Sequence, residues 1–212
     1  MFHIKKFTFN PFSENTYVLY NDKKQAFIID PGMYFQEEFQ RFDQFIQENE
    51  LIPELLINTH THLDHLFGNA HVARTYNIQL AFHAADKPVF DAATSAGALY
   101  DLPFEKSPEP SFYLKEKESI QLGEDRFEIL LTPGHSPGSV CFHQAEQHVL
   151  ISGDVLFQMS VGRTDLPGGN AQDLYRSITS TLFSLPNETI VYSGHGPETT
   201  IGFEKQNNPF IQ

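Results

Sequence analysis

The chain has 212 residues, of which 40% are hydrophobic and 13% aromatic, a composition typical of one globular domain with a sizeable core. Asp and Glu number 27 against 14 Lys and Arg, and the formal net charge of −13 disfavours binding to nucleic acid or to anionic membranes. The single cysteine, Cys141, excludes an intrachain disulfide and a thiolate metal cluster.

The first half of the chain alternates between apolar runs and helical periodicity. Apolar residues at helical spacing predict an amphipathic helix over 35–49. The stretch "AFIIDPG" (26–32) predicts a short buried strand that its Pro-Gly pair ends. The same patterns predict the remaining elements of this half, which are strands at 2–9, 16–20, 54–60 and 78–84 and helices at 66–76 and 85–98.

Residues 101–118 mix prolines, charges and aromatics, which predicts an excursion over the surface rather than a domain linker. Long segments of this kind often act as lids. Phe104, Phe112 and Tyr113 are therefore expected either to cover the mouth of a site or to anchor the segment to the core.

The second half predicts strands at 126–132, 139–144, 147–153 and 188–196 and a helix at 172–185. Asp30 and Asp154 each end a strand, a helix follows each, and the next strands end at His60 and His195. This echo predicts two βαβ-like units that present polar residues at the carboxyl ends of strands, where open α/β sheets place their sites.

The densest group of candidate ligands lies in "INTHTHLDHLFGN" (57–69), which holds His60, His62, Asp64 and His65. Two histidines at alternate positions of an extended segment point the same way. A structural zinc site is closed by four ligands. With further donors expected from elsewhere in the chain, the surplus predicts two ions or an open catalytic site.

Three further donors follow apolar runs and lie beside glycine: His135 in "LLTPGHSPGS", Asp154 in "LISGDVLF" and His195 in "VYSGHGPET". Strand ends beside turns are places where a rigid scaffold holds binding groups. A lone histidine after a strand is usually a surface residue, and that interpretation applies to the others, which are His3, His71, His83, His143 and His148.

The pattern Thr-His-x-His-x-Asp-His (59–65), followed by His135, Asp154 and His195, resembles the metallo-β-lactamase superfamily. Within it, the chain looks most like the short form of the glyoxalase II-type hydrolases. The stretches that carry this likeness are "SENTYVLY", "IIDPG", "TPGHSPGS", "GDVLF", "GRTD" and "GHGPETTIG". The resemblance covers nearly the whole chain and implies one domain, 1–212, with a four-layer αββα sandwich and the site at one edge of the two sheets.

The same resemblance implies the ligands of two divalent metal ions. His60, His62 and His135 would hold the first ion, Asp64, His65 and His195 the second, and Asp154 would bridge them. Such donors suit Zn²⁺, and also iron or manganese. The implied reaction is hydrolysis of an acyl thioester by a hydroxide that bridges the ions, with Asp64 as the catalytic residue that orients it.

Arg163 would contact the substrate, although it could instead pair with Asp165 to brace its loop. Asp30 is expected to brace a turn near the site and is not predicted as a ligand. Full-length glyoxalase II proteins carry a helical extension after the last histidine that helps to hold glutathione. Residues 196–212 resemble no such extension, so little reliance on a glutathione tail is expected.

Several alternatives stay open. A persulfide dioxygenase would use one iron held by His60, His135 and Asp154, and a lactonase or phosphodiesterase would share the predicted metals. A metal-free scaffold protein is disfavoured because every candidate ligand is present. A β-lactamase is disfavoured because Cys141, within the strand-like "SVCFH", is typical of a buried apolar residue rather than a ligand.

The expected partner is a small-molecule substrate, and the oligomeric state is left open. The stretch "MFHIKKFTFNPF" lacks the apolar region of a signal peptide. No window approaches the roughly 20 apolar residues of a membrane span. The sequence therefore predicts a cytoplasmic protein.

Overall fold

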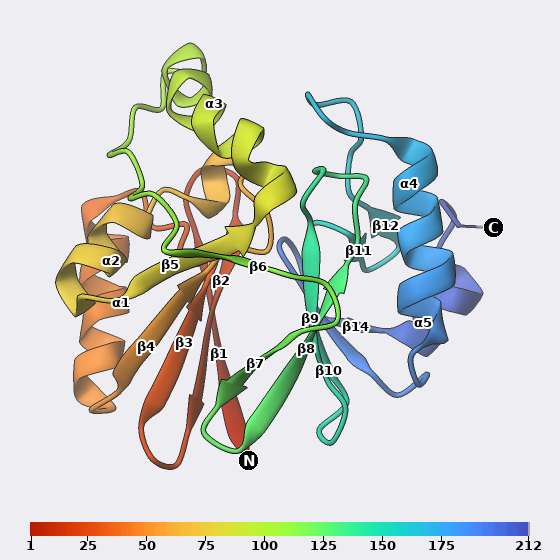
Figure 1. The fold of residues 1–212 in the computed structure, drawn as a ribbon, viewed down its shortest axis with the longest axis horizontal. Helices are drawn as coiled ribbons and strands as arrows, with labels where there is room; N and C mark the ends of the chain where they lie inside the picture. The colour runs from red at the N-terminus through yellow and green to blue at the C-terminus, as the bar shows by residue number, and fades with distance from the viewer. Residues whose placement is uncertain (212) are drawn as a thin grey trace.

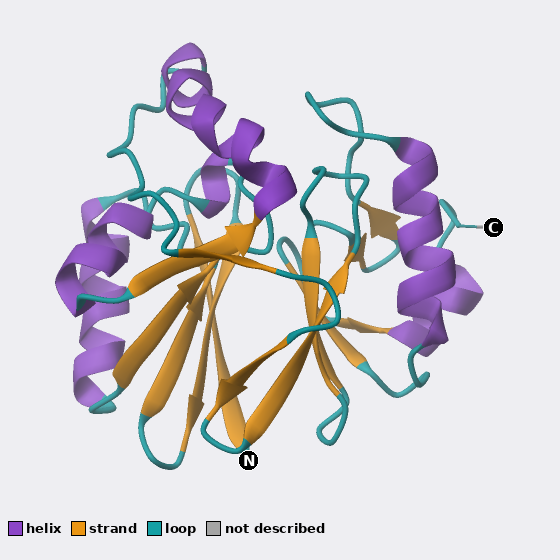
Figure 2. Ribbon diagram, viewed as in Figure 1, coloured by secondary structure: helices purple, strands orange, loops and turns teal. Residues whose placement is uncertain are grey.

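Two six-stranded sheets lie face to face in the computed structural model, which describes residues 1–211 (Figure 1). The first sheet has the order β1-β2-β3-β4-β5-β6 and the second has the order β14-β13-β10-β9-β8-β7. Helices cover the outer face of each sheet, as Figure 2 shows. This arrangement confirms the predicted four-layer αββα sandwich.

The first sheet joins an antiparallel start to a parallel edge. Strands β1 to β3 pair antiparallel, whereas β3 to β6 pair parallel. Its strands are β1 (Phe2–Phe9), β2 (Glu14–Asn21), β3 (Gln25–Ile29), β4 (Ile52–Ile57), β5 (Gln79–His83) and β6 (Phe112–Leu114). The helices of this half are α1 (Gln36–Glu48), α2 (Asn69–Tyr76) and α3 (Lys87–Leu99).

The second sheet is antiparallel except between β10 and β13. Its strands are β7 (Ser119–Leu122), β8 (Asp125–Leu131), β9 (Val140–Gln144), β10 (Val149–Gly153), β13 (Ile190–Ser193) and β14 (Thr199–Thr200). A small hairpin of β11 (Leu156–Phe157) and β12 (Ser160–Val161) lies beside it, and α4 (Ala171–Arg176) and α5 (Ile201–Asn207) cover its outer face.

The core is divided by the two sheets into three clusters, because a strand sends alternate side chains to opposite faces. In β2, Val18 joins the cluster under the first helices, whereas Tyr17 and Leu19 join the cluster between the sheets. Leu174 of α4 and Ile178 of the turn that follows it pack against the second sheet. Both sheets are therefore buried on two faces over their central strands, and the carboxyl ends of β4, β8, β10 and β13 meet at one edge.

Most predicted elements are present, and the differences have local causes. The strand predicted over 26–32 ends at Ile29, since Asp30 turns the chain with a φ of +49°. The strand predicted over 54–60 ends at Ile57, so that 58–60 are free to enter the site. The helix predicted over 172–185 consists of α4, a π-helical turn and a 3-10 turn. The short strands β6, β7, β11, β12 and β14 and helix α5 were not predicted.

The segment 101–118 is anchored to the first half of the fold. The ring of Phe104 lies 5.0 Å from that of Phe67, and Phe104 also packs against Gly97 of α3. Phe112–Leu114 form β6, which brings the ring of Tyr113 to 5.8 Å from that of Phe82. These contacts favour the anchoring role over the lid. Across residues 1–211, none of the helices combines the length and apolar character that a membrane crossing requires.

Candidate metal centre

The seven predicted ligands all lie at the edge where carboxyl ends of strands from both sheets meet. His60 and His62 follow β4, and Asp64 and His65 form part of a 3-10 turn, Leu63–His65. His135 follows β8, Asp154 follows β10 and His195 follows β13. The tertiary structure therefore brings together every side chain that the sequence singled out as a ligand, and their role as ligands stays a prediction.

The loop that carries the first four donors is held in shape by buried hydrogen bonds. Asp30 accepts hydrogen bonds from the backbone N–H and the hydroxyl of Thr59, at 2.7 and 2.5 Å. The side chain of Asn58 donates to the carbonyl of His65 at 2.9 Å and so closes the loop on itself. This confirms the expected bracing role of Asp30.

His60, His62 and His135 form one cluster of ring nitrogens. Nε2 of His135 lies 3.2 Å from Nε2 of His60 and 2.8 Å from Nδ1 of His62. The ligand atoms of all three lie within 4.8 Å of one another. Three nitrogens that point at one place, two of them from a single loop, are a typical arrangement for holding a cation.

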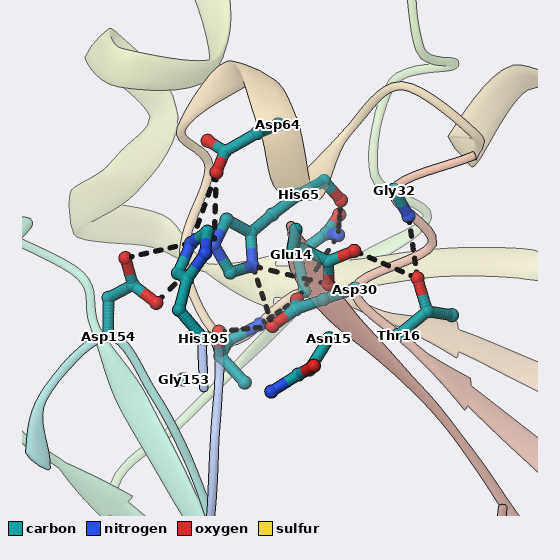
Figure 3. Close-up of polar contacts among 12 residues, drawn as sticks. Glu14, Asn15, Thr16, Asp30, Gly32, Asp64, His65, Gly153, Asp154 and His195 are labelled. Atoms are coloured by element: carbon teal, nitrogen blue, oxygen red, sulfur yellow. Dashed lines mark hydrogen bonds and ion pairs between the residues drawn. The ribbon is translucent and has the colours of Figure 1, made fainter. Parts of the chain in front are cut away.

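Asp64, His65 and His195 form the second cluster, drawn in Figure 3. Oδ2 of Asp64 lies 3.2 Å from Nε2 of His195 and 3.8 Å from Nε2 of His65. Unlike the first cluster it contains a carboxylate, so the two clusters differ by one negative charge when the histidines are neutral.

Asp154 lies between the clusters and reaches both. Its Oδ1 is 3.5 Å from Nε2 of His65, and its Oδ2 is 3.5 Å from Nε2 of His195 and 3.6 Å from Nε2 of His135. Among residues 1–211, Nε2 of His65 and Oδ1 of Asp154 are buried without a hydrogen-bond partner. Buried polar atoms are normally paired, so these two atoms fit the role of ligands to a cation.

Burial shapes the protonation of the first cluster. It is the main reason that the pKa of His60 lies well below its usual value and that the pKa of His62 falls to about 3. Neighbouring histidines lower both further. The rings of His60 and His62 are therefore neutral at physiological pH, which leaves their lone pairs available to a metal ion.

In the second cluster, neighbouring charges outweigh burial in setting the pKa values. Burial alone would lower the pKa of His65, but Asp64, Asp154 and Asp30 outweigh it and raise that pKa well above its usual value. Burial would raise the pKa of Asp64 and of Asp154, but His65 and His195 lower both. In the absence of a metal ion, the carboxylates are thus charged and compensated by imidazolium.

Backbone carbonyls hold the Nδ1 atoms of two histidines. Nδ1 of His135 lies 2.8 Å from the carbonyl of Arg163, and Nδ1 of His195 lies 3.1 Å from the carbonyl of Phe12. Nδ1 of His65 lies 3.1 Å from Oδ2 of Asp30, a contact between charged groups that lacks the geometry of a hydrogen bond. An acceptor at Nδ1 fixes the tautomer that leaves Nε2 free for a metal. His62 is the exception, since its Nδ1 faces the cluster.

Glu14 is a buried carboxyl group that sequence reasoning missed. It is fully buried at the start of β2, its Oε1 lies 3.8 Å from Nδ1 of His65, and its Oε2 accepts a hydrogen bond from Thr16 at 2.9 Å. Burial raises the pKa of Glu14 well above its usual value. Figure 3 places it with Asp30 on the side of His65 away from the ligands. Its one sequence signal is an acidic residue that opens the apolar strand "ENTYVLY".

Arg163 pairs with Asp165 through two contacts of 2.7 Å, and both side chains are mostly exposed. This is the bracing alternative that the sequence left open. The carbonyl of Arg163 also holds His135, so the loop positions a predicted ligand through its backbone. A contact between the guanidinium and a substrate stays a prediction.

The donor set fits divalent metal ions. Imidazole and carboxylate donors without thiolate suit zinc, iron or manganese. Cys141 is fully buried in the core beneath the last helices, which confirms that it is not a ligand of this site. The histidines set aside by the sequence lie elsewhere, as with His71, whose Nε2 is 2.9 Å from Asp43.

A model of the metallo-β-lactamase superfamily matches residues 9–195. Hydroxyacylglutathione hydrolase GloC of Haemophilus influenzae is 37% identical over 202 residues, which cover 94% of this chain and 93% of GloC. The crystal structure of BLEG-1 B3 metallo-β-lactamase superposes with a TM-score of 0.91 at 38% identity and covers 99% of this chain and 100% of that one. The structure of TTHA1623 in a di-iron-bound form gives a TM-score of 0.87 at 37% identity, covering 97% and 99%.

Proposed function

The chain belongs to the metallo-β-lactamase superfamily and is a metal-dependent hydrolase of that family, and we propose that it hydrolyses acyl thioesters at a dinuclear metal centre. The observation that carries the proposal is Asp154, whose Oδ2 lies 3.6 Å from Nε2 of His135 in the first cluster and 3.5 Å from Nε2 of His195 in the second. With a single ion, one of the two clusters of donor atoms would hold no metal.

The proposed metals are two divalent ions, with zinc as the first choice and iron or manganese as alternatives. Their ligands would be His60, His62 and His135 for one ion, Asp64, His65 and His195 for the other, and Asp154 for both. Bound in pairs, such ions lower the pKa of water, polarise a carbonyl and stabilise the negative charge that develops on its oxygen.

The protein side chains then have defined tasks. Asp64 contacts His195 at 3.2 Å, and its side chain is 15% exposed, so it reaches the surface at the edge of the site. It would orient the attacking water and accept its hydrogen bond. His60 and His65 lie buried behind this edge and exclude solvent from the inner side of the site. A thiolate is a weak base, so its departure needs little help from a general acid.

A thioester is favoured over other substrates by the relationship to GloC, which is named as a hydroxyacylglutathione hydrolase. The site itself offers few groups for a large anionic tail. Arg163, the cation predicted to contact the substrate, is engaged by Asp165. The small-molecule substrate proposed here is therefore an acyl thioester whose recognition centres on the acyl group rather than on glutathione.

The test pairs metal analysis with a panel of small acyl thioesters. We expect close to two metal ions per chain in fully active protein, and hydrolysis that a chelator abolishes and added metal restores. The proposal would be refuted in favour of the dioxygenase by protein that holds a single iron, consumes oxygen with a persulfide and does not hydrolyse thioesters.

β-Lactam hydrolysis is a second candidate, because BLEG-1 is described as a B3 metallo-β-lactamase and shares 38% identity with this chain. A β-lactam amide and a thioester both form a tetrahedral oxyanion, so the same centre could stabilise either. The two are separated by comparing kcat/KM for a cephalosporin and for an acyl thioester on the same preparation. We expect the thioester value to be the larger.

A further inference from the structure

Asp86 is a fully buried carboxylate that hydrogen-bonds to two loops of the site at once. It ends the 3-10 turn Ala84–Asp86, between β5 and α3. Its Oδ2 accepts from the backbone N–H of Thr61 at 2.6 Å and from the hydroxyl of the same residue at 3.1 Å. Its Oδ1 accepts from the backbone N–H of Gly138 at 2.6 Å and from the hydroxyl of Ser136.

These partners are neighbours of the first histidine cluster. Thr61 lies between His60 and His62, and Ser136 directly follows His135. One loop belongs to the first sheet and the other to the second. Asp86 therefore ties together the two loops whose histidines converge, although it makes no hydrogen bond to any of the three rings.

The close approach requires glycine at position 138. A Cβ atom there would lie 2.6 Å from the backbone nitrogen of Asp86 and 3.0 Å from its Oδ1. Both distances are too short for an ordinary contact. The absence of a side chain at Gly138 thus lets its N–H reach the carboxylate directly.

We propose that Asp86 is a positioning residue that holds His60, His62 and His135 at the separation needed to bind one metal ion. The proposal rests on the metal centre inferred above but not on its substrate. Asp86 makes no hydrogen bond or ion pair with Asp64, His65 or His195 of the second cluster, so its effect should be confined to one of the two ions.

Asparagine cannot replace this carboxylate without conflict. Each oxygen of Asp86 faces a backbone N–H, from Thr61 on one side and Gly138 on the other. Backbone N–H groups cannot turn into acceptors, whereas an amide side chain carries one oxygen and one NH₂ group. Whichever way the introduced amide is oriented, its NH₂ group opposes one of these donors, and one loop is released.

The test measures stepwise metal binding by chelator competition in wild-type protein and in Asp86→Asn, with Co²⁺ absorption as the spectroscopic signature. Loss of partners behind metal ligands commonly costs about 10- to 100-fold in metal affinity. We expect a loss of this size for one ion and no change for the other. The affected step should match the step lost in His62→Ala and differ from the step lost in Asp64→Asn.

The matched control is Glu204→Gln. Glu204 is also a buried carboxylate, but it accepts hydrogen bonds from Met159, Asn208 and Thr199, none of which adjoins a predicted ligand. It should change stability and leave both metal affinities intact. Ser136→Ala removes one hydrogen bond to Asp86 and is the substitute variant if Asp86→Asn does not fold. It should weaken binding of the same ion to a smaller extent.

Unchanged affinity for both ions in folded Asp86→Asn, or equal weakening of both, would overturn the proposal. The measurement needs no substrate. A failure of the thioesterase assignment would therefore leave the metal-binding result readable, and a failure here would leave that assignment standing.

Discussion

Oδ2 of Asp64 lies 3.2 Å from Nε2 of His195, although one residue belongs to the turn after β4 and the other follows β13 at the end of the opposite sheet. The second cluster is therefore shared by both halves of the fold. The backbone N–H of Asn15 donates to the carbonyl of Gly194 at 2.7 Å, and its side chain donates to Ser193 and Gly196. These contacts hold the His195 loop against the first sheet.

Asp64→Asn should lose most hydrolysis while the fold persists. The substitution removes a predicted ligand and the group that would orient the nucleophile, and six other donors remain. Loss of one electrostatic catalytic group commonly costs about 10² or more in rate. The measurement is kcat with a thioester substrate, with circular dichroism to verify folding. The control is Asp173→Asn on α4, a half-buried carboxylate that pairs with Arg176. Near-wild-type turnover by folded Asp64→Asn would remove Asp64 from the mechanism.

Asp30→Asn should lower the free energy of unfolding of the metal-free protein by about 1–3 kcal/mol, the usual cost of leaving a buried donor unsatisfied. Asp30 is 1% exposed and accepts two hydrogen bonds from Thr59, and an amide cannot preserve both contacts and still face Nδ1 of His65. Urea unfolding provides the measurement. Asp22→Asn is the control because Asp22 is 82% exposed. An equal effect of the two substitutions would contradict the bracing role.

Arg163→Ala separates substrate binding from loop bracing. Arg163 and Asp165 are both mostly exposed, so the midpoint of thermal unfolding should not change measurably. If Arg163 binds the thiol carrier, KM should rise for a glutathione thioester and not for the same acyl group on a truncated thiol. We expect the wild-type preference for the glutathione form to be at most roughly 10-fold in kcat/KM. A preference of several hundredfold that Arg163→Ala abolishes would show that glutathione is recognised after all.

Cys141 should resist thiol reagents in the folded protein. It is fully buried, and burial raises the pKa of its thiol to about 12. Because the thiolate is the reactive form and the raised pKa leaves very little of it, labelling between pH 7 and pH 9 should be far slower in the folded protein than in the unfolded protein. The rate of labelling with a chromogenic disulfide checks this, with urea-unfolded protein as the reference. Rapid labelling at pH 7 without unfolding would show that the thiol is accessible.

The position of each candidate ligand in the chain was predictable because it depends on local patterns. An apolar run that ends in a Pro/Gly turn marks a strand end whatever the rest of the fold does, and His135, Asp154 and His195 all follow such runs. The spacing within 59–65 is likewise local. These features were sufficient to predict the four-layer sandwich through the family resemblance and to find all seven candidate ligands.

The sequence alone determined which donors this protein owns and that they lie at strand ends, since both are properties of short segments. Only the tertiary structure decided which buried side chains support these donors. Glu14 beside His65, and Asp86 between Thr61 and Gly138, are contacts between segments far apart in the chain. The short edge strands β6 and β14 also depend on a neighbour that the sheet supplies. No short segment of the sequence shows which buried carboxylate will face which loop, because that depends on how the two sheets pack.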